Sequence, residues 1–352
     1  MIVDGTKCGV PMAWSFCHIW NQTLEAGRAD KPLFPRNHIW AGELGGPYLD
    51  RYLKMTAVVP SNPPNARAKR KFEAGNLMEW IVKLVLTRAG ILQQAQEWVS
   101  SQVGETQITG YLDFQAGGHP DYEKALHKID LIGLPDFFGR AARAIIEHLR
   151  KEYPDGLREI LLECKSCASM MLTKYQSSGP DRRHALQLYH YLRAKEIQEG
   201  HLVYISRDDL LMEECLVPQP AEPWETRYCE DAATMHNFLQ AKQRPPLEEE
   251  VFFDWETNKF SKNWRVEYSN YLTMLYGYAE PIDYRDRWDK PVAQWNRVVG
   301  RVAQGKQMTK LNLEVLAAIR LHFPRFDAEI ADPLRKLFGA GTLEMEEEDN
   351  ED

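Results

Sequence analysis

Glu163 and Lys165 are the first residues whose types and spacing indicate chemistry. They follow a short apolar run at 160–162, which we expect to be a buried strand. Successive side chains of a strand point to opposite faces, so the carboxylate and the amine emerge together while Cys164 points away. The chain turns after Lys165, and open α/β sheets present ligands at such strand ends. The pair therefore indicates a catalytic role, with a solvated strand edge as the alternative.

Asp113 supplies a second carboxylate on another expected strand, at 107–115. If the two strands pair, Asp113 and Glu163 together hold a hard divalent cation such as Mg²⁺, which requires oxygen ligands and favours a site shared with a substrate phosphate. Such a cation polarises a phosphodiester and lowers the pKa of a bound water. Lys165 then orients that nucleophile or offsets the charge of the transition state. The three residues together predict metal-assisted hydrolysis.

Three further polar residues lie on expected helices. Glu79, on the expected helix at 75–89, is a candidate metal ligand, and an ordinary helix ion pair with Lys83 is the alternative. Gln187 and Tyr191 are four residues apart and therefore share one face of the expected helix at 181–199. They are candidates to contact the substrate or the catalytic lysine. The alternative is that they belong to a helix face packed on the sheet.

Taken in order, these residues resemble the PD-(D/E)XK nuclease superfamily. The similarity is to its RecB-like exonuclease branch, which includes the CRISPR-associated RecB-like nucleases and phage relatives. It covers about residues 35–230 and consists of four motifs: Gly75...Glu79, Gly110-x-x-Asp113, Glu163-x-Lys165 and Gln187-x-x-x-Tyr191. The resemblance implies a restriction-endonuclease-like fold. It also implies that Asp113, Glu163, the backbone carbonyl of Cys164 and, more loosely, Glu79 bind Mg²⁺ or Mn²⁺, that Lys165 is catalytic, and that Gln187 and Tyr191 lie beside the site.

The sequence departs from this family in two places. About 50 residues separate Asp113 from Glu163, where relatives often have a short hairpin, and we expect an inserted helical region at 118–156 with a helix at 136–152. Asp136 therefore remains an alternative first metal acid. Many relatives also bind an iron–sulfur cluster, but Thr226 stands where a thiolate is expected and no Cys-x-x-Cys follows. We therefore interpret the outlying cysteines as reduced, mostly buried thiols, namely Cys8, Cys17, Cys215 and Cys229.

Basic residues flank the proposed site along the chain. The candidates for contacts with a DNA backbone are Arg67, Lys69, Arg70, Lys174, Arg182 and Arg183, and solvated helix faces are the alternative. The net charge of −8 does not exclude DNA, because seven of the last nine residues are acidic and the rest of the chain carries only −1. We expect this acidic tail, at 341–352, to be disordered.

The expected elements alternate between helix and strand, which predicts an α/β or α+β core with a central mixed sheet flanked by helices. We divide the chain into an N-terminal segment at 1–65, a nuclease-like core at 66–230 and a mainly helical, aromatic-rich module at 247–340 that follows Pro245 and Pro246. The helix at 75–89 is apolar nearly all round, so we expect it to be buried.

Composition places the chain among ordinary globular proteins, with 44% hydrophobic and 27% charged residues in a length of 352. No apolar run reaches the roughly 18 residues of a membrane span, and the N-terminus does not resemble a secretory signal, so we expect a cytoplasmic protein without a membrane partner. The expected function is a metal-dependent DNA nuclease, an exonuclease of replication, repair or recombination, with a phage origin as one option. Its expected partners are DNA, as single strands or duplex ends, and other recombination or replication proteins. The alternative is a catalytically inactive nuclease fold that binds nucleic acid or protein.

Overall fold

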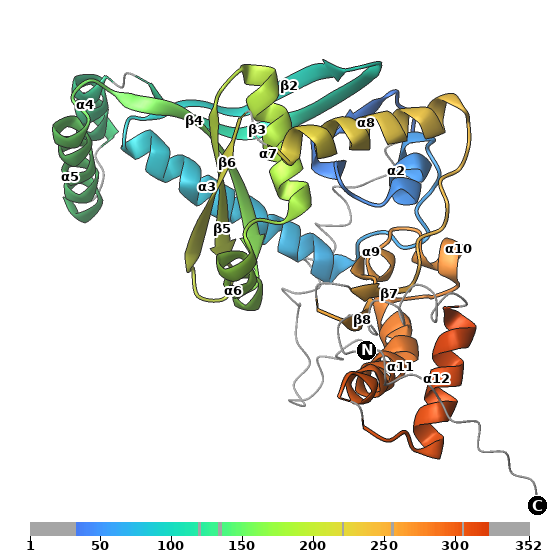
Figure 1. Cartoon of the computed structure of the whole chain (residues 1–352). Coiled ribbons are helices and arrows are strands. Elements are labelled where there is room, and N and C mark those ends of the chain that lie inside the picture. The colour runs from blue at the N-terminus through green and yellow to red at the C-terminus, as the bar shows by residue number, and fades with distance from the viewer. Residues whose placement is uncertain are drawn as a thin grey trace, which may run out of the picture. The chain divides into compact units, whose positions relative to one another are not determined.

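The computed structural model describes residues 33–118, 121–132, 136–219, 222–254, 257–304 and 306–323. The chain divides into two compact units, which we describe separately (Figure 1). The first comprises the described residues of Met1–Val59 and Pro64–Pro245, and the second those of Pro60–Pro63 and Pro246–Asp352. The division thus falls within the Pro245-Pro246 pair. The acidic tail, Cys8 and Cys17 lie outside the described residues.

The first unit is built on a mixed six-stranded sheet. Its strands are β1 (His38–Trp40), β2 (Leu92–Val103), β3 (Thr106–Gly118), β4 (Leu157–Cys167), β5 (Glu199–Ser206) and β6 (Met212–Pro218). Their order is β1-β3-β4-β5-β6, and β2 pairs with β3. The pairs β1 with β3 and β4 with β5 are parallel, and the others are antiparallel. A mixed central sheet, as expected from the sequence, is therefore confirmed.

Strand β3 changes partners along one of its edges. Its first part pairs with β1 as far as Thr109, opposite Trp40, and its last part pairs with β4 from Phe114 onward, opposite Leu162. Because β2 occupies the other edge along nearly the whole strand, β1 and β4 share this edge and separate at residues 110–113. The sheet is therefore forked beside Asp113.

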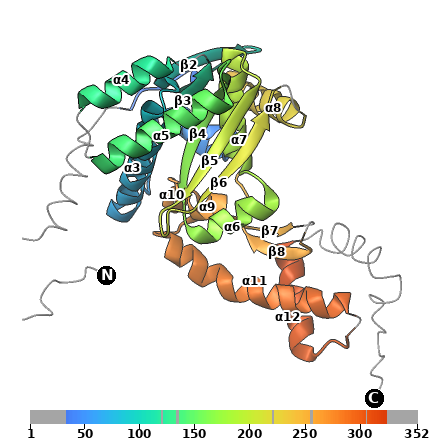
Figure 2. The same cartoon turned by 90° about the vertical axis from the view of Figure 1, so that its left-hand side faces the viewer.

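Helices cover both faces of this sheet, as Figure 2 shows. They are η1 (Ala41–Glu43), α2 (Tyr48–Met55), α3 (Ala66–Arg88), α6 (Ser169–Ser178), α7 (Arg182–Lys195) and α8 (Trp224–Gln240). Alternation along β4 separates the two faces: Leu161 belongs to the main core with α7 and α8, whereas Leu162 packs with Leu86 of α3 in a smaller core. The catalytic candidates on α3 and α7 therefore approach the sheet from opposite faces.

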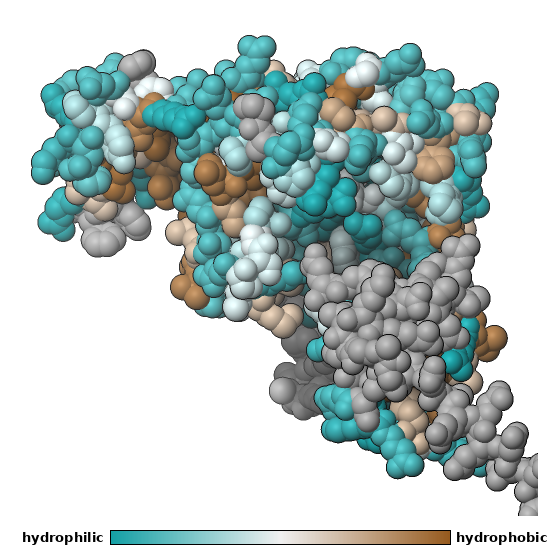
Figure 3. Space-filling view, in the orientation of Figure 1, coloured by the Kyte–Doolittle hydropathy of each residue, from teal (hydrophilic) through white to brown (hydrophobic). Residues whose placement is uncertain are grey.

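The expectation that the helix at 75–89 is buried was wrong. Of the residues of α3, only Leu86 is buried, whereas Leu77, Trp80, Ile81 and Val85 are 43–61% exposed. Figure 3 shows hydrophobic areas within the otherwise hydrophilic surface of this unit. An all-round apolar helix is buried only where neighbours surround it, and α3 contacts the sheet through one face alone.

The residues between β3 and β4 form a helical hairpin of α4 (Tyr122–Ile132) and α5 (Asp136–Glu152). Ala125, Ala142 and Ile146 form a small core of their own there. The insertion leaves the antiparallel pairing of β3 with β4 intact. The helices inserted between Asp113 and Glu163 thus lie outside the sheet and do not separate the two strands (Figure 1).

The second unit is mainly helical, which confirms the expected character of the C-terminal region. It comprises β7 (Val251–Asp254), β8 (Lys259–Lys262), α9 (Trp264–Glu267), α10 (Leu272–Tyr276), α11 (Pro281–Ala303) and α12 (Lys310–His322). Its core is aromatic and includes Phe260, Tyr284, Trp288 and Trp295. Among the described residues of both units, no helix has the length and apolar character that spanning a membrane requires.

Candidate active site

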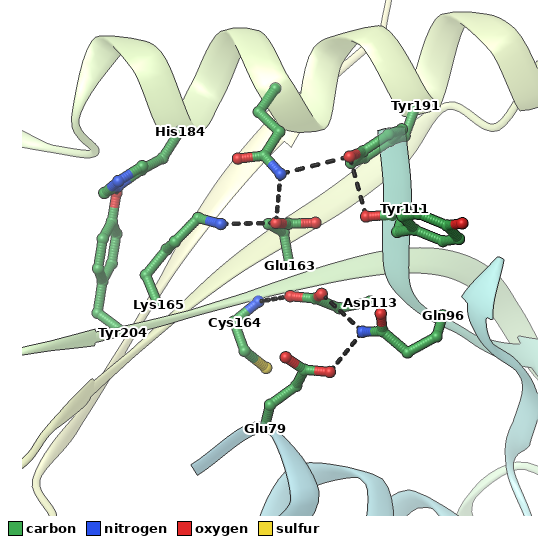
Figure 4. A network of polar contacts seen from close by, with 11 residues as sticks. Glu79, Gln96, Tyr111, Asp113, Glu163, Cys164, Lys165, His184, Tyr191 and Tyr204 are labelled. Carbon is green, nitrogen blue, oxygen red and sulfur yellow. Dashed lines mark hydrogen bonds and ion pairs between the residues drawn. The ribbon is translucent and has the colours of Figure 1, made fainter. Parts of the chain in front are cut away.

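Asp113 and Glu163 lie on neighbouring strands at the fork of the sheet. The pairing of β3 with β4 ends at Phe114, opposite Leu162. Asp113 and Glu163 are the next residues on the side of the fork. Asp113 Oδ2 accepts a hydrogen bond of 2.8 Å from the backbone N–H of Cys164. Figure 4 shows both carboxyl groups directed into the same region. The structure therefore brings the two acids together across 50 residues of sequence, measured from 113 to 163.

Glu163 is held by an amine and an amide on the α7 side of the sheet. Its Oε1 accepts hydrogen bonds from Lys165 Nζ at 2.6 Å and from Gln187 Nε2 at 2.7 Å. The residue is only 1% exposed. Its second oxygen, Oε2, is buried and makes no hydrogen bond of normal geometry within the described residues, although the backbone of Asp113 is close enough to influence it. A buried carboxylate oxygen without a hydrogen bond is costly, so this atom is available to a further ligand.

Tyr191 links this carboxylate to the fork of β3. Gln187 Nε2 also contacts the Tyr191 hydroxyl, at 3.3 Å, and that hydroxyl donates a hydrogen bond of 2.9 Å to the backbone carbonyl of Tyr111. Gly110 makes this approach possible, because a Cβ there would lie 2.4 Å from the Tyr191 hydroxyl oxygen. The Gln187-x-x-x-Tyr191 motif therefore orients Glu163 and occupies the gap between β1 and β4.

Glu79 joins the cluster through a residue that sequence reasoning missed. Gln96 of β2 donates its side-chain amide to Asp113 Oδ1 at 3.1 Å and to Glu79 Oε1 (Figure 4). Gln96 adopts a left-handed backbone conformation, with φ of 53°, which interrupts the regular strand beside Asp113. A glutamine in a strand has no residue type or spacing that indicates catalysis. Its role becomes visible only when β2 is paired with β3.

Burial raises the pKa of all three acids, and the charge of Asp113 raises that of the other two further. Burial, followed by the charge of Asp113, raises the pKa of Glu163 to about 8 and that of Glu79 to about 7. Burial also raises the pKa of Asp113. Burial lowers the pKa of Lys165, but the charges of Glu163 and Asp113 outweigh it, so its pKa rises overall and the amine stays protonated. Three acidic groups thus share one ammonium, which is too little positive charge to keep all three ionised.

This donor set fits a hard divalent cation. Mg²⁺ is commonly bound by one or two carboxylates, with water and substrate phosphate completing its shell, and Asp113 with Glu163 Oε2 provides that number of protein oxygens. Within the described ranges, no group of three or more His, Cys, Asp or Glu side chains is arranged so that it could hold a metal ion by itself. Burial raises the pKa of the Cys164 thiol, so it stays protonated and is a poor ligand. A contribution from the Cys164 carbonyl remains a prediction.

The other candidates lie elsewhere on the first unit. Asp136 begins α5, but its side chain lies outside the described residues, whereas Asp113 contacts the Glu-x-Lys strand directly. Arg67, Lys69 and Arg70 lie on α3, Lys174 on α6, and Arg182 and Arg183 at the start of α7. Arg183 also forms an ion pair of 3.4 Å with Asp181. Of the outlying cysteines, Cys215 and Cys229 are free thiols.

Comparisons with known proteins add little to this geometry. No protein-family model matches the chain, and no curated protein matches it. One solved structure, described as "Crystal structure of SSO0001", is similar over 73% of this chain and 93% of its own, with 16% sequence identity and a TM-score of 0.41. A likeness at that level carries no functional argument.

Proposed function

We propose that this protein is a metal-dependent DNA nuclease that hydrolyses phosphodiester bonds. The observation that carries the proposal is the convergence of Asp113, Glu163 and Lys165 at the fork of the sheet, with Glu163 Oε2 buried and unbonded among the described residues. Two carboxylates beside one ammonium form the combination that metal-assisted phosphodiester hydrolysis needs. The motif order supports assignment to the PD-(D/E)XK superfamily and its RecB-like exonuclease branch.

Asp113 and Glu163 would hold Mg²⁺ or Mn²⁺, with Glu79 as a further candidate ligand. A divalent cation supplies Lewis-acid polarisation of the phosphate and lowers the pKa of water. Lys165, which touches Glu163 at 2.6 Å, remains protonated beside the scissile phosphate and offsets the charge that develops on its oxygens. Positive charge fixed at that position acts most strongly in a buried site, where water does not screen it.

Gln187 and Tyr191 act as positioning residues in this proposal. Gln187 donates to Glu163 Oε1, which leaves Oε2 turned toward the cation position. Tyr191 fixes Gln187 and is itself anchored on the carbonyl of Tyr111. Gln96 likewise positions Asp113 and Glu79, because its side-chain amide donates to both carboxyl groups. Hydrogen-bonded partners of metal ligands typically affect metal affinity or activity by about 10–100-fold.

The decisive experiment incubates purified full-length protein with end-labelled DNA and Mn²⁺ or Mg²⁺. We expect cleavage that EDTA abolishes, and a loss of at least about a hundredfold in Lys165→Ala and Glu163→Gln. Lys310→Ala, on α12 of the second unit, is the matched lysine control. Circular dichroism checks that each variant is folded. Intact DNA with every metal tested would contradict the proposal and support a catalytically inactive nuclease fold.

The cleavage products would distinguish an exonuclease from an endonuclease. Release of mononucleotides from one end of the labelled strand would support an exonuclease, as expected from the RecB-like branch that the motifs resemble. Comparison of 5′-labelled and 3′-labelled strands would give polarity. A role in replication, repair or recombination, and partners in those processes, remain parts of the same proposal.

A further inference from the structure

The strands that form the fork also carry three aromatic rings in mutual contact. Trp98 of β2 pairs with Tyr111 of β3, and their rings meet edge to face at 5.0 Å. Trp40, at the end of β1, contacts Trp98 at 5.5 Å and lies nearly parallel to Tyr111 at 6.4 Å. We call Trp40, Trp98 and Tyr111 the aromatic platform. Its rings come from three adjacent strands and therefore keep fixed positions.

Two of the three rings are exposed, although they are large and apolar, and Trp40 is half-buried. Trp98 and Tyr111 are 47% and 51% exposed. Their strand neighbours Ile108 and Leu112 face the main core with α7, which places Tyr111 on the opposite face of the sheet. Among the described residues, the smaller core beneath α3 is formed farther along β3, by Phe114 and Ala116. The rings thus lie where neither helix layer covers them.

The platform is continuous with the proposed active site. The backbone carbonyl of Tyr111 accepts the hydrogen bond from Tyr191, and Asp113 follows two residues later on the same strand, roughly 7 Å along it. Figure 4 shows Tyr111 beside Tyr191 and Gln96 within the polar network. Trp40 leads into η1, where Gly42 lies against the Gln187 amide. A polymer bound at Asp113 would therefore extend along β3 over the Tyr111 ring, which lies on the same face two residues away.

The residues beside the rings on the side away from Asp113 are uncharged. Opposite positions in paired strands lie on the same face, and the pairings place His38, Ser100, Gln102 and Gln107 beside the rings, whereas Thr109 between them is buried. Burial and the nearby Arg36 charge lower the pKa of His38, which keeps it neutral. The exposed rings therefore lie beside the hydrogen-bonding groups of Ser100, Gln102 and Gln107 on this face. Unpaired bases expose the ring faces and polar edges that such a surface binds, whereas a duplex hides its base faces in its own stack.

We propose that the aromatic platform binds the unpaired bases of a single-stranded segment adjoining the scissile phosphate. This inference rests on the proposed nuclease function and specifies its substrate as DNA with an unpaired strand. Binding comes from stacking rather than from charge, so the platform distinguishes strands by whether they have accessible bases. The basic residues on α3, α6 and α7 are not required for this step.

Direct binding tests the platform separately from cleavage. Full-length protein in EDTA is titrated into a fluorescein-labelled oligothymidylate, an abasic strand of the same length, and a blunt duplex, with anisotropy as the readout. We expect the thymidylate to bind at least about tenfold more tightly than the abasic strand, which has the same phosphates without bases. The blunt duplex should bind as weakly as the abasic strand.

Substitutions assign the difference to the rings. Trp98→Leu and Tyr111→Leu keep an apolar side chain but remove the ring, and each should weaken thymidylate binding roughly tenfold without changing abasic binding. Trp98→Phe should retain most of the affinity. Trp264→Leu is the matched control, because Trp264 is similarly exposed, at 40%, on the second unit. The dependence of affinity on salt should stay the same in the ring variants.

The outcomes separate this inference from the nuclease proposal. Equal binding of thymidylate and abasic strands, or ring variants that bind like the wild type, would overturn the platform even if the protein cleaves DNA. Ring-dependent binding without cleavage in any metal would support the platform and contradict the nuclease proposal. Ring variants that only dissociate a protein dimer would show that the rings form a protein interface, which also overturns the inference.

Discussion

Asp113 accepts a hydrogen bond of 2.8 Å from the backbone N–H of Cys164, the residue between Glu163 and Lys165. This single contact joins the first acid to the middle of the Glu-x-Lys motif and fixes how the two strands meet. Gln96 adds Glu79 to this pair, so the carboxyl groups of Glu79, Asp113 and Glu163 share one partly buried cluster with the Lys165 amine.

Metal binding should stabilise the protein more at high pH than at low pH. Without metal, the pKa of Glu163 is about 8 and that of Glu79 about 7, both above their unfolded values of 4.5. A raised folded pKa contributes stability that is present below pH 4.5 and is lost as pH rises to about 8. Since a divalent cation offsets that loss, Mn²⁺ should raise the melting temperature more at pH 8 than at pH 5.5. An equal shift at both values would count against a site at these acids.

Glu163→Gln should abolish nuclease activity and yet stabilise the metal-free protein. The amide keeps the shape of the side chain but removes a buried carboxylate that lies near Asp113, and the Asp113 charge continues to offset the Lys165 ammonium. We expect a melting temperature higher by roughly 2–4 °C in EDTA at pH 8, measured by calorimetry. The gain should disappear when saturating Mn²⁺ is added to both proteins. A variant that melts earlier in EDTA would refute the charge argument.

Gly110→Ala should destabilise the protein by about 1–3 kcal/mol, because the new Cβ would meet the Tyr191 hydroxyl oxygen at 2.4 Å. Urea denaturation measures the loss. In a Tyr191→Phe background the same change should cost less, since the hydroxyl is gone, although Ala41 remains 2.9 Å from the new atom. A double-mutant cycle with no coupling between the two positions would show that Tyr191 does not occupy the fork as described.

Gln96→Ala should weaken Mn²⁺ binding and activity by about 10–100-fold, the range typical of partners that orient metal ligands. Gln96 is the residue that bonds both Asp113 and Glu79. Isothermal titration with Mn²⁺ gives the affinity. Gln94→Ala, two residues earlier on β2 and bonded instead to Lys195, is the matched control. If both variants behave alike, Gln96 has no special role.

Acid should unfold the protein in part through His190, which is fully buried against Tyr228 at 2.8 Å. Burial, followed by the Arg193 charge, lowers its pKa to about 3, so the folded state holds it neutral. A lowered pKa contributes stability above pH 6.5 that is lost as pH falls toward 3, at up to about 1.4 kcal/mol per pH unit. His190→Gln should therefore flatten the acid limb of the stability curve measured by urea denaturation. An unchanged slope would argue that His190 is protonated in the folded protein.

The local sequence was sufficient for much of the architecture. The strands expected at 107–115 and around 160–162, and the helices expected at 136–152 and 181–199, correspond to elements that the structure contains. These signals are local because hydrogen bonding and side-chain direction within one element depend on near neighbours. The same reasoning missed β1, β2 and β6, since short or polar edge strands have no strong pattern of their own.

The sequence by itself determined which side chains with catalytic chemistry this protein has and on which elements most of them lie. Only the tertiary structure decided which of them meet. Asp113 reaches Glu163 because β3 pairs with β4 across an inserted helical hairpin, and Gln96 and the rings of Trp40 and Trp98 join the site through β1 and β2. It also decided that α3 leaves one apolar face exposed. Strand register and helix packing are set by contacts between residues distant in sequence, and no local pattern encodes those contacts.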